Sequence, residues 1–271
     1  MTFSGVENVV GTVLADRISG NAGDNRIGDG LFDQGADTVL GRGGDDVVFL
    51  TAQAAGARLD GGSGRDTLIF ATYSQPQGDG TGNFTLTEAV LDLRDPQANT
   101  GSFANVGIEG FEVFQADAGL IWLSIFRFLG DGGDQKVIGR DEVPGTFLPT
   151  GKDRLFGLAG DDSLIGLSGA DVLGGGQGDD RLFGGAGRDV LTGGDGQDVM
   201  TGGSGRDRFV FDAGSSAPAS PDRITDFRPG TDLIDLRALG PMELITGAID
   251  GPGQVSAVVR GAATEVRVNL S

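Results

Sequence analysis

Aspartates recur at a fixed interval of nine residues in the second half of the chain, where glycine is abundant. The aspartates at this interval are Asp153, Asp162, Asp171, Asp180, Asp189, Asp198 and Asp207. The short side chain of aspartate keeps its carboxylate close to a turn, and carboxylate and carbonyl oxygens are the ligands that calcium takes in proteins. The spacing therefore predicts a row of calcium sites, with several ions bound by one chain.

These aspartates belong to a repeated nonapeptide. From Gly157 to Val210 the sequence reads as G-G-x-G-x-D-x-U-x, where U is a large apolar residue, and this motif is a known calcium-binding repeat. A rougher series near the N-terminus has Ala57 at one of its aspartate positions, which leaves open a coil whose turns bind metal only in places. The other residues at position six of that series are Asp16, Asn25, Asp37, Asp46 and Asp66. Similar segments recur in both halves and indicate an internal duplication.

The nonapeptide predicts alternating turns and strands. Its glycines permit backbone conformations that other residues adopt only at a cost, and its last three residues suit a short strand with one inward side chain. Two nonapeptides would close one coil, so stacked turns would lie about 4.8 Å apart, the spacing of neighbouring strands. An ion between them could reach oxygens above and below, because calcium–oxygen distances are about 2.3–2.6 Å.

We therefore expect an all-β fold, a parallel β-roll formed by a calcium-binding nonapeptide solenoid, with two tandem rolls and additional β-strands. Backbone carbonyls in the glycine half of each repeat would complete the metal sites. The glycines that we assign to these sites are Gly157, Gly166, Gly175, Gly184 and Gly193.

Four segments follow from the distribution of repeats. Residues 1–70 would form a first roll with degenerate repeats, and residues 148–211 a second roll with regular repeats. Residues 71–147 do not follow the nonapeptide and would form a capping and bridging β region. Residues 212–271 would form a C-terminal β cap that is similar to a secretion signal.

The composition limits the function. A net charge of −19 excludes a nucleic-acid footprint, which needs a basic face, and disfavours anionic membrane surfaces. The chain has 32 Asp but 7 Glu, a bias typical of turns and of short rigid oxygen ligands. It contains neither Cys nor His, which removes disulfides, thiolate sites and the commonest zinc ligand. Its most apolar run, 119–129, is too short to span a bilayer, which takes about 20 residues.

The carboxylates also connect metal binding with folding. Stacked carboxylates repel one another, and each coil offers one large apolar residue per strand. Divalent ions would relieve the repulsion, so metal binding is expected to drive folding. Because extracellular calcium modules often bind at about 10⁻⁴–10⁻³ M, we expect the chain to fold where calcium is plentiful.

The regular array and the segment DRFVFDAGSSAPASPDRITDFRPGTDLIDLRAL, residues 207–239, resemble the RTX (repeats-in-toxin) family of secreted calcium-binding proteins. The segment is similar to the region after the array in serralysin-type proteases and alginate epimerase modules. The resemblance implies a parallel β-roll, calcium in its turns, and export by a type I secretion apparatus with an uncleaved C-terminal signal. It also implies that Asp222 completes the last calcium site. No N-terminal signal peptide is visible, which agrees with that route, whereas the ending VRVNLS lacks the acidic and apolar tail often seen in the family.

Catalytic motifs are missing from the sequence. It has no histidine-based zinc motif, no G-x-S-x-G and no P-loop, so we expect the chain not to be an enzyme. The function that we expect is a secreted, extracellular calcium-binding module with the type I secretion apparatus as a partner. The alternatives are an adhesive or carbohydrate-binding module that contacts polysaccharide through residues 71–147, and a non-catalytic part of a larger secreted enzyme. An enzyme with an unrecognised carboxylate site in residues 71–147 is a further alternative.

Overall fold

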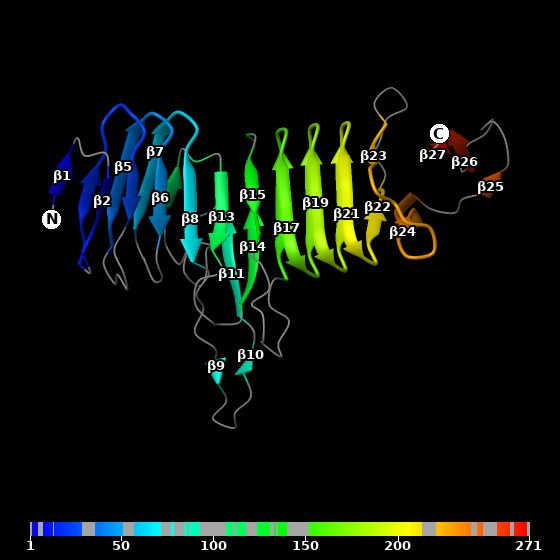
Figure 1. Cartoon of the computed structure of the whole chain (residues 1–271), viewed down its shortest axis with the longest axis horizontal. Coiled ribbons are helices and arrows are strands. Elements are labelled where there is room, and N and C mark those ends of the chain that lie inside the picture. The colour runs from blue at the N-terminus through cyan, green and yellow to red at the C-terminus, as the bar shows by residue number, and fades with distance from the viewer. Residues whose placement is uncertain are drawn as a thin grey trace.

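In the computed structural model, short parallel strands coil into a solenoid whose axis runs along the length of the molecule (Figure 1). The structure describes residues 2–4, 8–12, 14–28, 36–50, 57–71, 77–78, 84–85, 87–92, 107–109, 111, 113–117, 124–130, 133, 135–139, 152–212, 221–239, 243–245, 254–260 and 263–269. Paired residues of neighbouring strands in the second array, such as Leu173 and Leu191, lie two nonapeptides apart in the sequence. One coil therefore consists of two repeats, as the spacing predicted.

One face of the solenoid is a ten-stranded parallel sheet that extends through both arrays. Its strands are, in order, β2 (Asn8–Val10), β4 (Arg26–Gly28), β6 (Val47–Leu50), β8 (Thr67–Ala71), β13 (Val113–Asp117), β15 (Lys136–Ile138), β17 (Ser163–Gly169), β19 (Arg181–Gly187), β21 (Val199–Gly205) and β23 (Arg223–Ile224). β13 pairs with β8 and β15, and β15 pairs with β17, all in parallel. Two strands from the segment without repeats therefore join the arrays end to end.

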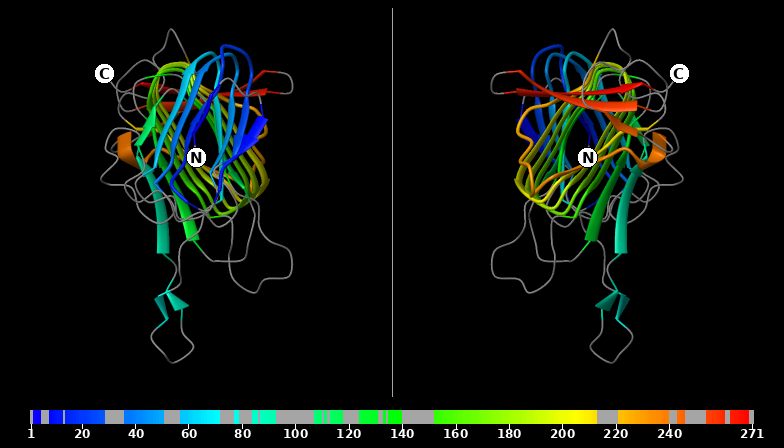
Figure 2. Two further views of the ribbon diagram at one scale, coloured as in Figure 1. Left: turned by 90° about the vertical axis from the view of Figure 1, so that its left-hand side faces the viewer. Right: turned by 90° about the vertical axis from the view of Figure 1, so that its right-hand side faces the viewer.

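The opposite face consists of two parallel sheets. The five-stranded sheet contains β1 (Thr2–Ser4), β3 (Arg17–Ser19), β5 (Thr38–Gly43), β7 (Arg58–Ser63) and β12 (Gly107–Glu109). The seven-stranded sheet contains β11 (Thr87–Asp92), β14 (Ser124–Leu129), β16 (Arg154–Ala159), β18 (Val172–Gln177), β20 (Val190–Asp195), β22 (Arg208–Val210) and β24 (Leu233–Asp235). The view along the axis shows the two faces enclosing a narrow interior (Figure 2).

A few short elements lie outside the coil. They are the antiparallel pair β9 (Gln77–Gly78) and β10 (Phe84–Thr85), the 3₁₀ helix Arg237–Leu239, and the three-stranded sheet of β25 (Glu243–Ile245), β26 (Gln254–Arg260) and β27 (Ala263–Asn269). Over the described ranges the chain has no helix long and apolar enough to cross a membrane. The all-β parallel β-roll is thus confirmed, while the four segment boundaries stay a prediction.

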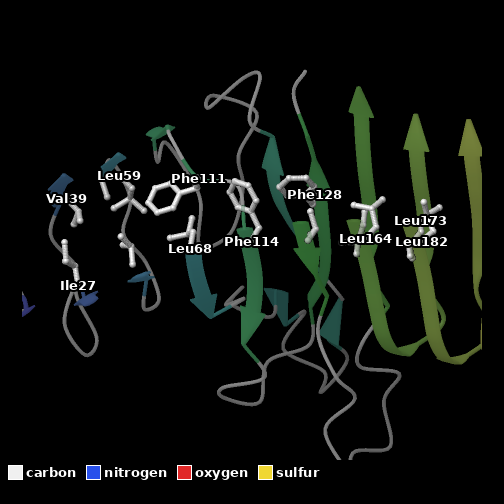
Figure 3. Packing of buried hydrophobic residues seen from close by; sticks show 14 of the residues in the cluster. Ile27, Val39, Leu59, Leu68, Phe111, Phe114, Phe128, Leu164, Leu173 and Leu182 are labelled. Carbon is white, nitrogen blue, oxygen red and sulfur yellow. The ribbon is translucent and has the colours of Figure 1, made fainter. Parts of the chain in front are cut away.

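The interior is a row of apolar side chains that come from both faces (Figure 3). The residue at position eight of each nonapeptide points inward, and residues such as Leu164, Leu173 and Leu191 are 0% exposed. Between the arrays Phe114 and Phe128 continue the row, with ring centroids 5.0 Å apart. The core is therefore only one residue deep from each face. The polar turns make further contacts between coils.

The turns stack along two edges of the solenoid. We define edge A by the turns 166–171, 184–189 and 202–207, which lead out of the ten-stranded sheet, together with Asp153 and with Asp16 and Asp37 of the first array. We define edge B by the turns that lead back into it, namely 20–25, 41–46, 61–66, 157–162, 175–180 and 193–198. The two edges hold all of the predicted calcium ligands that lie in the repeats.

Candidate metal centre

Each turn brings a carboxylate against its own backbone because position one is glycine. At Gly184 a Cβ atom would lie 2.5 Å from Oδ2 of Asp189 and 2.8 Å from the carbonyl oxygen of Gly202 in the next turn of the edge. A Cβ at Gly166 would likewise lie 2.5 Å from Oδ2 of Asp171 and 2.6 Å from the carbonyl oxygen of Gly184. The first glycine thus leaves room for a carboxylate oxygen and a carbonyl oxygen from two successive turns to converge.

Positions two and four are glycine in most turns for a different reason, although Arg42, Leu158 and Leu167 stand at position two with φ angles of 75–88°. In the turn 184–189, Gly185 and Gly187 have φ angles of 112° and 140°, a region that favours glycine. The space that a Cβ would take at these two residues is filled by the carbonyl oxygens of Leu167 and Gly169, which are positions two and four of the preceding turn. Each turn therefore directs two carbonyl oxygens along the edge toward the turn that follows.

The aspartates at position six form one column on each edge. On edge B, Oδ1 of Asp180 accepts a hydrogen bond from the Asp162 amide at 2.8 Å, and Oδ1 of Asp198 accepts one from the Asp180 amide at 2.9 Å. On edge A, Oδ1 of Asp189 accepts one from the Asp171 amide at 2.9 Å. Each carboxylate thus uses one oxygen to bind the turn before it, and the column has a direction.

The second carboxylate oxygen is the chemically unsatisfied one. Oδ2 of Asp46, Asp180, Asp189 and Asp198 is buried and accepts no hydrogen bond from the described residues. A buried carboxylate without a full set of partners is costly, so such atoms normally have a ligand or a proton. These oxygens point to a bound cation.

The pKa values of these aspartates also show that burial disfavours their charged form. Burial raises the pKa of Asp180 to about 7; the hydrogen bond from the Asp162 amide lowers it, while the charges of Asp198 and Asp162 raise it further. Burial likewise raises the pKa of Asp189 to about 6, opposed by the amide of Asp171 and supported by the charge of Asp207. Near neutral pH these carboxylates gain stability from either a proton or a cation beside them.

The donor set of the turns fits calcium. All the atoms that converge are oxygens, from carboxylates and from backbone carbonyls, and calcium takes six to eight oxygen ligands of these kinds. Within the described ranges, no group of three or more acidic side chains gathers at one point. A cation between turns would therefore take its remaining ligands from carbonyl oxygens, such as those of Gly184 and Gly202, or from water.

The two edges differ in their outer charge. At position five edge B carries the exposed carboxylates of Asp45, Asp161 and Asp179, although the turn 61–66 has an arginine there. In the second array, edge A carries no acidic side chain at the same position in its described turns, and two of the residues there are the exposed Arg188 and Arg206. The field at edge B is consequently more negative, which favours the accumulation of divalent cations there.

The structure brings most of the sequence-predicted residues into the two columns, although their role as metal ligands stays a prediction. Edge A contains Asp16, Asp37, Asp153, Asp171, Asp189 and Asp207. Edge B contains Asn25, Asp46, Asp66, Asp162, Asp180 and Asp198. The predicted glycines Gly157, Gly166, Gly175, Gly184 and Gly193 all lie at position one against the carboxylate of their own turn. Ala57, which is buried, interrupts the aspartates of edge A.

Asp222 extends the column of edge B. Its Oδ1 accepts a hydrogen bond from the Asp198 amide at 3.0 Å, as each aspartate of the array does for the turn before it. Sequence reasoning missed Asp232, whose Oδ1 accepts from the Asp207 amide at 3.1 Å on edge A. It also missed Gln135, whose backbone amide donates a hydrogen bond to Oδ1 of Asp162 at 2.8 Å. The triplet D-x-U, present at 222–224 and 232–234, is the signal that marks the two later residues; of the glycine half, only Gly230 at position four precedes the second triplet.

Comparison with known proteins supports the repeat assignment. The model of the RTX calcium-binding nonapeptide repeat matches the chain in four copies, at residues 2–27, 33–54, 150–182 and 174–209. No match to the chain was found among the curated proteins. The matches end at residue 209, so the similarity of the following segment to serralysin and epimerase modules stays a prediction.

Proposed function

We propose, on the premise that this chain is an RTX-type calcium-binding repeat protein, that calcium in its stacked turns drives the folding of the β-roll. We further propose that the folded roll is a non-catalytic module that works outside the cell. Calcium would lie between successive turns of an edge, held by carboxylates at position six and by carbonyl oxygens of the glycine half.

One observation carries this proposal. Oδ2 of Asp180, Asp189 and Asp198 is buried and accepts no hydrogen bond from the part of the chain that the structure describes, while Oδ1 of each residue already binds the preceding turn. A purely structural aspartate would have both oxygens satisfied. A cation beside Oδ2 would complete its coordination and cancel the repulsion along the column.

The same arrangement makes folding depend on the ion. The carboxylates are close together only when the turns stack, so the unfolded chain lacks these sites and the free energy of ion binding adds to the free energy of folding. The core contributes one side chain per strand, and it would not by itself offset the burial of two columns of charge. We therefore expect an expanded metal-free chain at pH 8.

A calcium titration of the metal-stripped chain tests the proposal. Far-UV circular dichroism should change from a coil-like to a β-rich spectrum, and equilibrium dialysis should detect several ions per chain at the same calcium concentrations. Magnesium should be much less effective, because it requires near-ideal octahedral geometry and loses its water reluctantly. A metal-stripped chain that is fully folded and binds no calcium would refute the proposal.

Export by a type I apparatus is the part of the proposal that concerns the cell. It rests on the calcium requirement, since a chain of this kind would stay unfolded at the low calcium of a cytosol and fold in a calcium-rich medium. Expression with and without such an apparatus, followed by immunoblots of the medium, tests it. Equal amounts of the chain in both media would contradict a type I route.

A further inference from the structure

The last nonapeptide turn on edge A, 202–207, is followed by a different kind of segment. Residues 226–232 lie where the next turn would stack. They bind both the backbone amides and the carbonyl oxygens of the turn 202–207. Oδ1 and Oδ2 of Asp226 accept the amides of Gly202 and Gly203 at 2.9 and 2.7 Å. Oδ1 of Asp232 accepts the Asp207 amide at 3.1 Å. Three backbone amides of the last turn thus donate to two carboxylates of the segment.

The acceptors of the last turn meet a side-chain cation. Nη2 of Arg228 donates hydrogen bonds to the carbonyl oxygens of Gly203 and Gly205, the second at 3.1 Å. These are the carbonyls of positions two and four, which in the preceding turn point along the edge at Gly203 and Gly205 themselves. Arg228 therefore lies in the direction in which every turn of the edge presents its oxygens.

Two carboxylates also lie beside the guanidinium of Arg228, whose side chain is 45% exposed. Nη2 of Arg228 lies 3.6 Å from Oδ2 of Asp207, and Nε lies 3.6 Å from Oδ2 of Asp232. Both carboxylate side chains are almost fully buried, at 0% and 2% exposed. The cation is thus bordered by two carbonyls and a carboxylate from the last turn and by a carboxylate from the segment that follows. This is the kind of oxygen set that a calcium ion between two turns would have.

We propose that Arg228 is a built-in cation that takes the place of calcium at the C-terminal end of edge A. The inference rests on the proposed function, because it assigns to a side chain the role that calcium has between the other turns. The terminal site is closed by the chain itself, so the segment 226–232 seals the column without requiring an ion of its own.

A related contact is made by Asn25 on edge B and by Gln135, whose backbone amide bonds Asp162 of the same edge. At Asn25 the side-chain amide donates to the carbonyl oxygen of Gly23, and at Gln135 it donates to the carbonyl oxygen of Gly133. Both carbonyls belong to the residue two places before position six, as that of Gly205 does in the last turn of edge A. Where an amide replaces the carboxylate of the repeat, a nitrogen donor therefore occupies this oxygen.

The test compares calcium binding by the full chain and by three variants. In Arg228→Ala the oxygens of Gly203, Gly205, Asp207 and Asp232 lose their cation, and equilibrium dialysis should count one more calcium per chain than in the wild type. Arg228→Lys keeps the charge and should keep the wild-type number. Arg206→Ala is the matched control, because Arg206 is an exposed arginine of the same turn, and it should also leave the number unchanged.

Amide exchange provides the second readout. In the wild type, the amides of Gly202, Gly203 and Asp207 should become protected at the same calcium concentration as the rest of the array. In Arg228→Ala they should become protected only at a higher concentration. An unchanged ion count together with an unchanged calcium dependence of these amides would overturn the inference.

The two proposals can fail separately. If the wild type binds no calcium, the proposed function is refuted, and a loss of protection at these amides in Arg228→Ala alone would then mark Arg228 as a purely structural cap. If the wild type binds calcium and Arg228→Ala loses protection without gaining an ion, the replacement of calcium by Arg228 is refuted while the proposed function stands.

Discussion

Replacing Asp180 by asparagine should have opposite effects on the metal-free and the calcium-bound roll. Asp180 lies in the middle of the edge B column, where its Oδ1 accepts from the Asp162 amide and its Oδ2 is buried without a hydrogen bond. In Asp180→Asn the amide oxygen can still accept from Asp162, but the charge is gone. The variant therefore removes the electrostatic cost and the metal ligand together.

The magnitude follows from the pKa. Burial raises the pKa of Asp180 from 3.8 to about 7, and each pKa unit corresponds to about 1.4 kcal/mol. At pH 8 the ionised carboxylate therefore destabilises the metal-free fold by on the order of 4 kcal/mol. The new amide donor costs about 1–3 kcal/mol if it finds no acceptor, so the metal-free roll should gain about 1–3 kcal/mol. In calcium the lost charged contact, worth about 1.5–3 kcal/mol, should weaken binding at least about tenfold.

The assay measures both effects on one protein. At pH 8 with a chelator, trimethylamine oxide favours compact states, and Asp180→Asn should fold at a lower concentration of it than the wild type. In a calcium titration the same variant should need more calcium to saturate its sites. Asp179→Asn is the control for the loss of one charge on the same edge, since the Asp179 carboxylate is exposed and accepts a hydrogen bond from the Gln197 backbone amide. A variant at 180 that is weaker in both assays, or that matches the control, would refute the electrostatic reasoning.

Three further predictions follow from the core, the turns and the titration of the columns. Burial raises the folded-state pKa of Asp180 to about 7 and of Asp189 to about 6. Their contribution to stability is therefore present below pH 4 and is lost as the pH rises through 6–7. Circular dichroism should find the metal-free chain more ordered at pH 5 than at pH 8, and a chain that is more ordered at pH 8 would contradict this prediction. Gly187→Ala places a Cβ against the carbonyl oxygen of Gly169 in the preceding turn, at a φ of 140°. Its free energy of unfolding in calcium, measured with urea, should fall by about 2–5 kcal/mol. Ser204→Ala, at an exposed position three, should change this free energy little. Leu191→Ala, at a side chain that is 0% exposed, should cost about 2–5 kcal/mol without changing the number of bound ions, and a lower ion count in dialysis would show that the core and the turns are not separable.

The periodic part of the molecule could be predicted from the sequence because two positions of the nonapeptide have fixed physical roles. Position eight is apolar since it is the one side chain that enters the narrow interior, and position six is aspartate since its carboxylate must reach both the preceding turn and the first glycine. These constraints recur every nine residues, so the parallel coil and the membership of each aspartate in a column follow from counting.

The irregular part could not be predicted by counting. The residues that close the columns, Asp222 and Asp232, pair with aspartates 24 and 25 residues earlier, which breaks the interval of the array. Arg228 carries no pattern of its own, and its role depends on a loop that returns to the last turn. The continuity of the ten-stranded sheet through β13 and β15 depends on residues 113–117 and 136–138, whose sequence does not follow the nonapeptide.

The direction of the columns explains why the array cannot end on a nonapeptide. Each aspartate accepts from the turn before it and offers its own amide to the turn after it, so the last aspartate on each edge needs an acceptor from outside the repeats. Asp222 and Asp232 supply that acceptor for Asp198 and Asp207, and a buried amide without one would cost about 1–3 kcal/mol. The outward carbonyls of the last turn on edge A need a cation in the same way, and Arg228 provides it. Residues 221–239 therefore continue both sheets and both columns of the roll in a sequence that no longer follows the repeat.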